Sequence, residues 1–559
     1  MRLRAHSTYT WRMIPYYVTT PIYYVNDRPH IGHCYTTLIA DVAARMHRLI
    51  GRDVFFLTGT DEHAEKVVAR ALENGVSPQE WADRNAEQFR RAFAFMNFSN
   101  DDFVRTTEER HKTRAARYIQ KLVDSGDIEL GDYEGWWDAS QEEYLTETVA
   151  KEHDYKSPVT GRPLEKRIEQ NYFFRLDRYQ DWLESQISSG QIRVLPEARR
   201  NEVLGRIRQG LQKVPVSRRI KPGDPDWGVR MPNDPEHRVY VWIEALCNYL
   251  TVVDNPERRK WWPADVHLMA KDILWFHAVI WPAMLKALGE PSPRTVYAHA
   301  YFIAEGRKMS KSLGNFIEID QLRAYAERFS LDAVRWFLTT QGPLGANDAD
   351  FAYQRFVEVY NAELANGIGN ATSRVANMIA KYFGGRVPEP VGADAAPTER
   401  STVDPRAVAA GVVEPFTASA GAMQLVEGLS LGMQLVTSVD RFINETRPFS
   451  LAKQLDKGEH PDPVRGRAEL GTVLYLCAEA LRIASLLLYP AMPDKMAELW
   501  RRWNCRHLVD PNDCNAAFVA PLAELAAWGG RFGLVSGQEI VKGDALFMRA
   551  DAGEPAPST

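Results

Sequence analysis

Cysteine is scarce in this sequence, and its few occurrences lie far apart. The 559 residues contain five cysteines and no CxxC pair; they are Cys34, Cys247, Cys477, Cys505 and Cys514. Disulfide scaffolds and thiolate zinc sites both require cysteines at close, regular spacing. The spacing therefore argues against both. We expect a reducing, cytoplasmic compartment, no structural zinc and no other protein-bound metal.

Long apolar runs and a strong net charge are also absent. No run of about 18 apolar residues occurs, so we expect no membrane span. A net charge of −5 gives no global sign of nucleic-acid binding, which needs only a local basic surface. The stretch 193–221 holds nine lysines and arginines against two glutamates. Both a nucleic-acid surface and an ordinary solvated helix face fit that stretch.

The first recognisable pattern in the sequence is a strand, a helix and a second strand. Residues 14–24 are rich in aromatic and β-branched residues and lead into a turn at 26–29. Apolar residues then recur every three or four positions, as in a helix with one buried face; they are Ile31, Cys34, Leu38, Val42, Met46 and Leu49. A buried strand at 54–58 follows. The order predicts an α/β fold with a doubly wound, parallel, Rossmann-like sheet, whose ligands lie at the carboxyl ends of the strands.

The length predicts several domains. We expect an N-terminal extension at 1–13, a catalytic domain at 14–114 and 216–300, an inserted connective subdomain at 115–215, a connecting region at 301–350, an all-α helix bundle at 351–545 and a disordered tail at 546–559. The first twelve residues carry three arginines and no acidic residue. They fit either a short targeting peptide or residues ahead of a start at Met13.

Two short motifs carry the chemistry. His30-Ile31-Gly32-His33 puts two imidazoles on one side of a helix start, where the backbone N–H groups and the helix dipole favour anions. Gly32 leaves room for a nucleotide beside the backbone. Taken alone, the motif is explained equally well by capping or core histidines. The second motif, Lys308-Met309-Ser310-Lys311-Ser312, offers ammonium groups and hydroxyls to a polyphosphate, although an exposed polar loop has the same composition.

In this order and setting the two motifs form the paired signature of class I aminoacyl-tRNA synthetases. Over about residues 14–540 the chain resembles the methionyl-tRNA synthetases, through the segments TTPIYYVNDRPHIGH, GTDEHAEK, YVWIEALCNY, AKDILWFH, EGRKMSKSLGN and NGIGNATSRV. The resemblance implies an ATP-dependent ligase. It would use ATP with Mg²⁺ to convert methionine into methionyl-adenylate, and then transfer the methionyl group to the 3′-terminal ribose of tRNA(Met). The alternative is a catalytically silent tRNA-binding paralogue.

The resemblance also implies roles for individual residues. The methionine side chain would lie against Ile22, Tyr24, Trp242, Ala245, Leu246, Tyr249, Ile273 and His277, and its ammonium group against Asp61. ATP would be bound by Gly32, His33, Ala270, Asp272, Lys308, Ser310 and Lys311. Catalysis would rest on His30, His33, Lys308 and Lys311, which stabilise charge on the α-phosphate and on the departing pyrophosphate.

Further positions match the anticodon readers of these synthetases, and some depart from the family pattern. Asn370 and Arg374, four apart on one helix face, would read base edges, and Phe449 stands where the family has a stacking tryptophan. Ala270 replaces a glycine, and Glu244 replaces an aspartate, a change that we expect to be tolerated. The absence of cysteine from 115–215 implies a zinc-free, single-knuckle variant. The chain stops shortly after the helical region, which favours a monomer.

Overall fold

A six-stranded parallel sheet forms the centre of the catalytic part of the molecule. The computed structural model describes residues 14–140, 143–145, 147–221, 223–309, 315–390, 401–551 and 553–557. The strands follow the order β3-β2-β1-β12-β13-β7, with bounds Asp102–Arg105, Asp53–Asp61, Pro15–Tyr24, Val266–Ala270, Thr295–His299 and Arg193–Leu195. Every pairing between these strands is parallel. The predicted doubly wound α/β fold is thereby confirmed.

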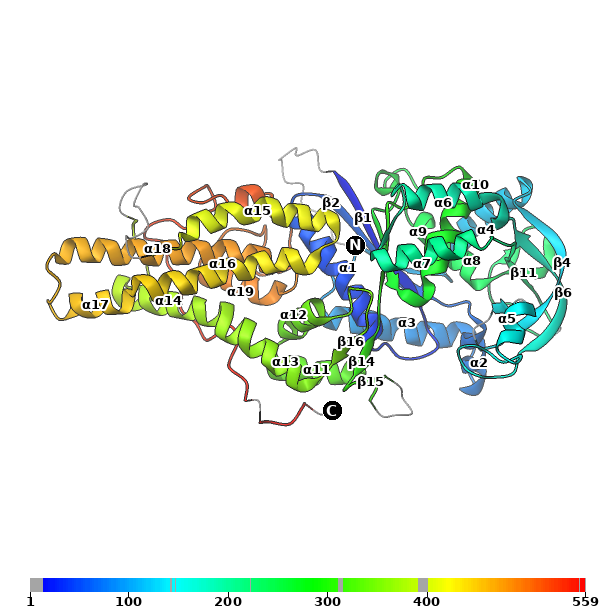
Figure 1. Cartoon of the computed structure of the whole chain (residues 1–559), viewed down its shortest axis with the longest axis horizontal. Coiled ribbons are helices and arrows are strands. Elements are labelled where there is room, and N and C mark those ends of the chain that lie inside the picture. Colours follow the sequence, from blue (N-terminus) through cyan, green and yellow to red (C-terminus); the bar gives the residue numbers. More distant parts are fainter. Residues whose placement is uncertain are drawn as a thin grey trace.

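Helix α1 (Ile31–Leu49) connects β1 to β2 and lies between the sheet and the helical part of the chain (Figure 1). The predicted apolar face, from Ile31 to Leu49, is buried, but so are most residues on the opposite side of the helix. The helix contacts β1, β2 and β12 of the sheet and also α12 (Leu331–Gln341) and α15 (Pro405–Ala422). The helix is therefore an internal element, which explains why polar residues within it are also buried.

The remaining elements of the catalytic part surround this sheet. Helices α2 (Glu65–Glu73), α3 (Pro78–Phe95) and α4 (Glu109–Asp124) follow β2 and β3. A second, four-stranded sheet has the order β5-β4-β6-β8, with bounds Glu143–Leu145, Ile128–Asp138, Glu165–Phe174 and Val214–Pro215. Helix α5 (Glu147–Glu152) contacts β4, whereas α6 (Gln180–Ser188) packs on α7 (Glu197–Arg208), which contacts β7. Strand β7, although it lies within 115–215, belongs to the central sheet.

Shorter elements connect the second sheet back to the first and lead on to the helical region. They are β9 (Ser217–Arg219), β10 (Arg230–Met231), β11 (Asp234–Val239), α8 (Val241–Leu246), α9 (Asn248–Thr251), α10 (Trp281–Leu288), β14 (Phe302–Ala304), β15 (Arg307–Lys308), α11 (Ile319–Phe329), β16 (Ala349–Phe351) and α13 (Tyr353–Val359). Two π-helical segments, Phe276–Ile280 and Tyr360–Gly369, precede α10 and α14.

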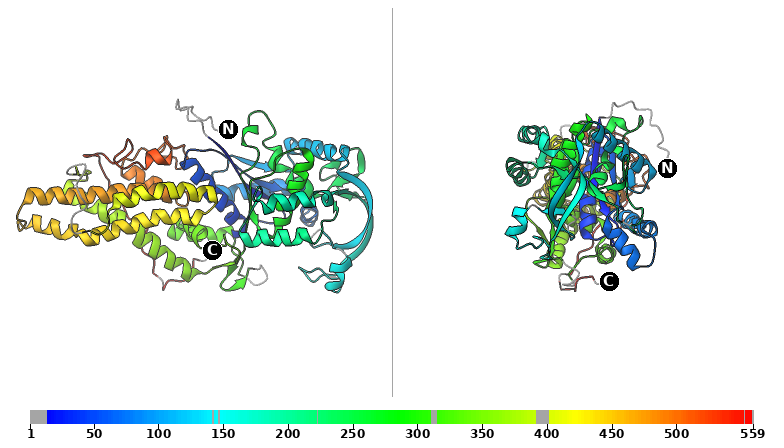
Figure 2. Two further views of the ribbon diagram at one scale, coloured as in Figure 1. Left: turned by 45° about the horizontal axis from the view of Figure 1, so that its top comes forward. Right: turned by 90° about the vertical axis from the view of Figure 1, so that its right-hand side faces the viewer.

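A bundle of long helices makes up most of the C-terminal half and extends away from the sheet (Figures 1 and 2). It contains α14 (Asn370–Phe383), α15, α16 (Leu425–Thr446), α17 (Pro448–Asp456), α18 (Pro463–Leu488) and α19 (Pro493–Arg502), and the short α20 (Leu522–Leu525) follows. Within the described residues α18 alone is long and apolar enough to span a membrane, and its apolar window is entirely buried. It contacts α14, α15, α16, α17 and α19, so bundle packing accounts for its composition.

Buried ionic groups join α1 to the helical region. Asp41 accepts hydrogen bonds from Arg45 Nε at 2.8 Å and from Arg335 Nη2 at 2.6 Å. Arg45 also donates to the Tyr489 hydroxyl at 3.1 Å, and Arg335 to the carbonyl oxygens of residues 490 and 491. Burial alone would raise the pKa of Asp41, but the two guanidinium groups hold it well below its usual range. Removing one partner from such a cluster typically costs about 3–5 kcal/mol.

Candidate functional site

The paired histidines form the N-terminal cap of α1. The backbone N–H of Gly32 donates to His30 Nδ1 at 3.0 Å, and that of His30 donates to His33 Nδ1 at 3.2 Å. The two ring centroids lie 3.8 Å apart. A Cβ atom at residue 32 would lie 2.9 Å from His30 Cε1, so glycine makes room for this ring as well as for a ligand. Capping and ligand binding are compatible here, because the cap uses only the Nδ1 atoms.

These hydrogen bonds determine which nitrogen carries the proton in each neutral ring. Because Nδ1 accepts from the backbone in both histidines, a neutral imidazole has its proton on Nε2. Desolvation, together with repulsion from His30, lowers the pKa of His33 well below 6.5. His33 is therefore a neutral Nε2–H donor, a suitable group for a phosphate oxygen at a helix N-terminus.

The segment that follows the lysine-serine motif lies against this helix start. The backbone N–H of Ile31 donates to the carbonyl oxygen of Ile317 at 3.1 Å, and His30 forms an antiparallel bridge with Glu318. The ring of Phe316 meets that of His30 edge-on, with centroids 4.8 Å apart. Residues 316–318, which follow the lysine-serine motif by a few positions, are thus adjacent to the helix start in the fold, although they lie almost 290 residues away in the sequence.

The lysine-serine motif itself is only partly described. Its first residue, Lys308, ends strand β15, which pairs with β14 opposite Ile303. Ser310, Lys311 and Ser312 lie outside the described residues. The phosphate-binding roles expected of Lys308, Ser310 and Lys311 therefore stay predictions.

An aromatic cluster lies between the carboxyl end of β1 and the start of α8. Tyr24, the last residue of β1, meets the Trp242 ring edge-on at 5.7 Å, and Trp242 stacks on Phe276 at 4.5 Å. All three rings are half-buried. Ile22 is half-buried on β1, while Ala245 and Leu246 are buried on α8 beside Trp242. Stacked pairs contribute about 0.5–1.5 kcal/mol beyond area burial, which holds an apolar wall in place.

Phe276 was not among the expected pocket residues. It stands directly before His277, in the segment AKDILWFH, and its stack on Trp242 is the closest ring contact of this cluster. The sequence could have indicated Phe276, because it is an aromatic residue next to an expected pocket residue. Its face-to-face contact depends on the π-helical segment 276–280, which no local pattern indicates.

A chain of hydrogen bonds fixes the inner side of this region. Tyr249 donates its hydroxyl proton to His277 Nε2 at 2.7 Å, because His277 Nδ1–H donates to the carbonyl oxygen of Ile273 at 2.9 Å. The Tyr17 hydroxyl donates to the carbonyl oxygen of Tyr249 at 2.9 Å. Burial lowers the pKa of His277 to about 4, so this imidazole is neutral at pH 7. These hydrogen bonds hold Tyr249 and His277 in place before any ligand enters.

A carboxylate closes the same region from β2. Asp61, the last residue of β2, lies opposite Tyr24 in the strand register and is buried. Its charge contributes to the raised pKa of Tyr249, behind the larger effect of burial, which places the two side chains within electrostatic reach. A buried carboxylate beside an apolar pocket favours a ligand with an ammonium group.

The carboxyl ends of β12 and β13 carry a second group of polar residues. Ala270 ends β12 opposite His299 of β13, and Asp272 follows it on an exposed turn. Asp272 hydrogen-bonds to Tyr301, and desolvation raises its pKa from the ordinary value. The carboxylate lies where parallel sheets bind nucleotides, at the ends of neighbouring strands.

Glu244 occupies a position whose importance the sequence did not reveal. Its carboxylate accepts hydrogen bonds from His63 Nδ1 at 2.8 Å and from His111 Nε2 at 3.2 Å. Burial alone would raise its pKa, but the two histidines lower it to about 2. The side chain thus ties α8, which carries Trp242, to the segment that follows Asp61. The only signal in the sequence was the departure from aspartate at this position.

The expected anticodon residues lie on α14 and α17, at a distance from β1 and β2 (Figure 1). Arg374 donates to Asp440 Oδ1 at 3.0 Å, and its guanidinium carbon lies 5.6 Å from the centroid of the Phe449 ring. Phe449 is 46% exposed, and Asn370 is exposed one turn before Arg374. The structure places a cation and a ring together on an accessible surface.

The basic stretch 193–221 is partly neutralised by acidic neighbours. Arg199, Arg208, Lys213 and Arg219 form ion pairs with four different glutamates. The guanidinium carbon of Arg206 lies 3.9 Å from the Trp275 ring centroid. These contacts favour a solvated, ion-paired helix face over a nucleic-acid surface.

Metal ligands do not cluster in the part of the chain that the structure describes. No group of three or more histidine, cysteine, aspartate or glutamate side chains there is arranged to hold a metal ion. The five cysteines are free thiols, and only Cys514 is partly exposed. The expectation of a zinc-free protein stays a prediction.

Comparison with known proteins gives concordant matches. The family described as "tRNA synthetases class I (M)" matches residues 16–153 and 148–376. Methionine–tRNA ligases of Caldanaerobacter subterraneus and Streptomyces coelicolor are each 40% identical to the chain over 96% of its length, covering 79% and 97% of the respective relative. The Mycobacterium tuberculosis methionyl-tRNA synthetase in complex with methionyl-adenylate superimposes with a TM-score of 0.82 at 34% identity, over 96% of this chain and 100% of that one.

Proposed function

The chain belongs to the methionyl-tRNA synthetases of class I, ATP-dependent ligases that join methionine to tRNA, and from this premise we propose how its residues divide the reaction. The observation that carries the proposal is the contact of His30 with Phe316 and Glu318. It sets the helix start with the paired imidazoles beside residues 316–318, a few positions after the lysine-serine motif, which supports a shared site for the two motifs.

Methionine binds in the aromatic region. Its thioether lies against Trp242 and Tyr24, because a flexible, polarizable sulfur packs well against ring edges. The pocket is completed by Ile22, Ala245, Leu246, Tyr249, Ile273 and His277. Asp61 pairs with the substrate ammonium group, which gives this buried carboxylate a cationic partner.

ATP binds across the carboxyl ends of β1, β12 and β13. Asp272 accepts hydrogen bonds from the ribose, and the adenine lies over the backbone near Gly32 and Ala270. The phosphates extend toward His33 and the motif that holds Lys308, Ser310 and Lys311. Mg²⁺ enters as part of the MgATP substrate, bound mainly by phosphate oxygens.

The activation step needs no side-chain nucleophile. A carboxylate oxygen of methionine attacks the α-phosphorus, the bond to the bridging oxygen breaks, and pyrophosphate leaves. The Nε2–H groups of His30 and His33 donate to α-phosphate oxygens as charge builds, while Lys308 and Lys311 neutralise the leaving group. A hydroxyl of the 3′-terminal ribose of tRNA(Met) then attacks the carbonyl carbon of the adenylate, and AMP leaves.

The distant end of the bundle recognises the tRNA. Arg374 and Asn370 reach the edges of unstacked anticodon bases, and Phe449 stacks on one of them. We assign the protein as a zinc-free, cytoplasmic monomer, supported by the absence of cysteine from 115–215 and the scattered free thiols elsewhere.

Pyrophosphate exchange into ATP tests the proposal directly. Each of the twenty amino acids is supplied in turn to the purified full chain, and exchange is expected with methionine alone. Charging of tRNA(Met) is then measured under the same conditions. Tight tRNA binding without exchange would identify a silent paralogue, and exchange with another amino acid would overturn the pocket assignment.

A further inference from the structure

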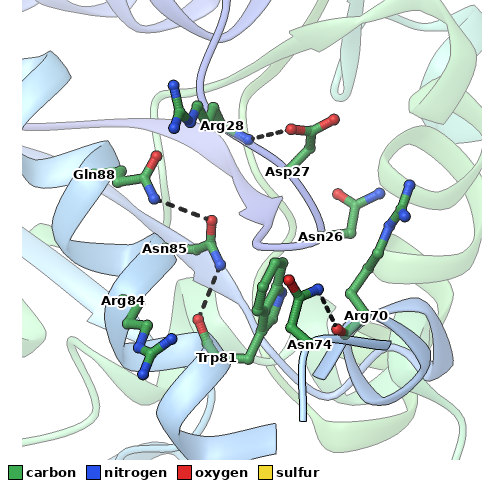
Figure 3. A pocket seen from close by; sticks show the side chains of 9 residues that line it. All are labelled: Asn26, Asp27, Arg28, Arg70, Asn74, Trp81, Arg84, Asn85 and Gln88. Carbon is green, nitrogen blue, oxygen red and sulfur yellow. Dashed lines mark hydrogen bonds between the residues drawn. The ribbon is translucent and has the colours of Figure 1, made fainter. Parts of the chain in front are cut away.

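A polar pocket of about 430 Å³ lies beside the helix start that carries the paired histidines (Figure 3). Its walls come from the loop that precedes His30 and from helices α2 and α3. Three arginines, Arg28, Arg70 and Arg84, stand on three sides of the Trp81 ring. The volume falls in the range of about 300–1,000 Å³ that is usual for ligand sites.

The charges of the lining favour an anion. Against the three guanidinium groups the pocket has one carboxylate, Asp27, which accepts a hydrogen bond from the backbone N–H of Arg28 at 2.7 Å. Among the described residues the Arg28 side chain makes no hydrogen bond or ion pair. In that same part of the chain, Arg70 and Arg84 form ion pairs only with Glu73 and Glu80 of their own helices, and all four side chains are exposed. Such exposed pairs are worth less than about 1 kcal/mol, so a phosphate can replace the glutamates at little cost.

The floor of the pocket is fixed and suits a nucleotide. The Trp81 Nε1–H donates to the carbonyl oxygen of Val25 at 2.9 Å, which holds the half-buried ring in place. The buried Asn85 amide donates to the carbonyl oxygen of Trp81 at 3.0 Å and lies next to Gln88. A held aromatic ring, amide groups and arginines together are typical of sites for single-stranded nucleic acid.

The position of the pocket indicates which ligand it binds. Arg28 precedes His30 by two residues, and the His33 ring meets that of Phe89, the residue after Gln88, with centroids 5.1 Å apart. The pocket therefore lies next to the helix start where the proposed function puts the adenylate. The one nucleic-acid segment that must enter that site is the single-stranded 3′ end of the tRNA. We propose that this pocket binds the phosphodiester backbone of that end and guides its terminal ribose to the adenylate. The inference rests on the proposed function and adds a tRNA-binding surface to it.

Removal of the three guanidinium groups tests the inference against a matched control. The test variant is Arg28→Ala/Arg70→Ala/Arg84→Ala in the full chain. The control is Arg91→Ala, because Arg91 also lies on α3, is 74% exposed and pairs with Glu87 as Arg84 pairs with Glu80, yet is no part of the pocket. Arg84→Lys, which keeps the charge, should retain most of the wild-type behaviour.

Two tRNA ligands give the decisive measurement. The dissociation constant is measured for tRNA(Met) and for the same tRNA without its single-stranded 3′ nucleotides. The wild type should bind the intact tRNA about ten- to thirtyfold more tightly, and the triple variant should bind both equally. The variant should also show a kcat/KM for tRNA that is about ten- to thirtyfold lower at low salt, and should keep wild-type pyrophosphate exchange. The slope of its salt dependence should be shallower by roughly 0.7 for each phosphate that the protein no longer binds.

Other results would overturn the inference. Equal weakening of both tRNA ligands would mean that the pocket binds another part of the tRNA, and reduced exchange with unchanged tRNA binding would mean that it holds ATP or pyrophosphate. A loss in Arg91→Ala as large as in the triple variant would indicate a general charge effect. Absence of methionine-dependent exchange in the wild type would count instead against the proposed function.

Discussion

The catalytic cleft and the far end of the helical bundle both set aromatic rings beside a titratable or charged group, but they differ in their exposure to water. In the cleft, His277 is buried and neutral, and its hydrogen bonds to Tyr249 and Ile273 are complete. At the bundle end, Phe449 is 46% exposed and Arg374 pairs with a half-buried Asp440.

The sizes of the two proposed ligands account for this contrast. A small amino acid cannot exclude water by itself, so its pocket must be dry and fixed beforehand. A tRNA covers a large surface and supplies its own burial, so its contacts can stay solvated until it arrives. Substitutions in the cleft should therefore affect chemistry strongly, and those at the bundle end should affect tRNA binding moderately.

The largest effect is expected for Lys311→Ala. Loss of a cation that stabilises the departing pyrophosphate should slow adenylate formation by about 10²–10³-fold, because such stabilisation acts mainly in the transition state. Single-turnover formation of adenylate gives the rate, and equilibrium titration gives methionine affinity, which should hardly change. Weakened methionine binding with an unchanged rate of adenylate formation would contradict the assigned role. It would also contradict the expectation that substitutions at the catalytic site mainly affect chemistry.

Glu244→Gln should have the next largest effect. A neutral amide cannot satisfy His63 and His111 as the ionised carboxylate does, so α8 should shift and carry Trp242 with it. We expect KM for methionine to rise about tenfold in pyrophosphate exchange, with kcat less affected.

Glu244→Asp provides the control for this change. Because it keeps the charge, it should restore most of the methionine affinity. A lower melting temperature with an unaltered KM in Glu244→Gln would show that Glu244 stabilises the fold without shaping the pocket.

A moderate effect confined to the tRNA is expected for Arg374→Ala. Removal of this side chain should lower kcat/KM for tRNA charging by roughly tenfold and spare pyrophosphate exchange, because α14 lies far from the cleft. Arg441→Ala, which removes another bundle arginine paired with Glu445 rather than placed over Phe449, is the matched control. Equal losses in charging and exchange would mean that the bundle end does not read the anticodon.

The smallest effect on activity is expected at the joint between the two regions. Asp332 is buried at the start of α12, and desolvation, aided by the charge of Asp494, raises its pKa from 3.8 to about 7. The folded state therefore holds this proton more tightly than the unfolded state between about pH 4 and 7. Stability should fall as pH rises through that range and level off above it.

Asp332→Asn tests the titration. It should raise the melting temperature most at about pH 8, less at about pH 5 and hardly at all near pH 3, below the pKa of the unfolded state, because the amide oxygen can still accept from the backbone N–H of Lys495. Asp320→Asn, at an exposed site on α11, should show neither effect. An unchanged difference between the variant and the wild type across this pH range would rule out Asp332 as the titrating group.

The core of the fold was predictable because its signals are local. Three elements can each be recognised from their own short stretch of sequence: the run of residues 14–24, the periodic helix from Ile31 and the buried strand near residue 55. Strand β7 was not predictable, because three residues are too few to show an alternating apolar and polar pattern. Its partner strand, β13, lies about 100 residues away in the sequence. Pairing at that range depends on the tertiary fold.

The site was predictable in its motifs and less so in its supporting contacts. Most expected pocket residues followed from the resemblance, and their partners in space did not. Asp41 and Arg45 are spaced as an ordinary surface ion pair, i to i+4 on a helix. They are buried because Arg335, almost 300 residues later, and the end of α18 cover them, a fact that no window of sequence contains.

The course of α1 has a consequence for the whole enzyme. One end of this helix holds the histidine pair, and eight residues beyond His33, about 12 Å along the axis, Asp41 is bound to the other half of the molecule. With nearly every side packed, the helix has no room to bend or slide on its own. A tilt of the long bundle would therefore move α1 as a rigid body and reorient both imidazoles together.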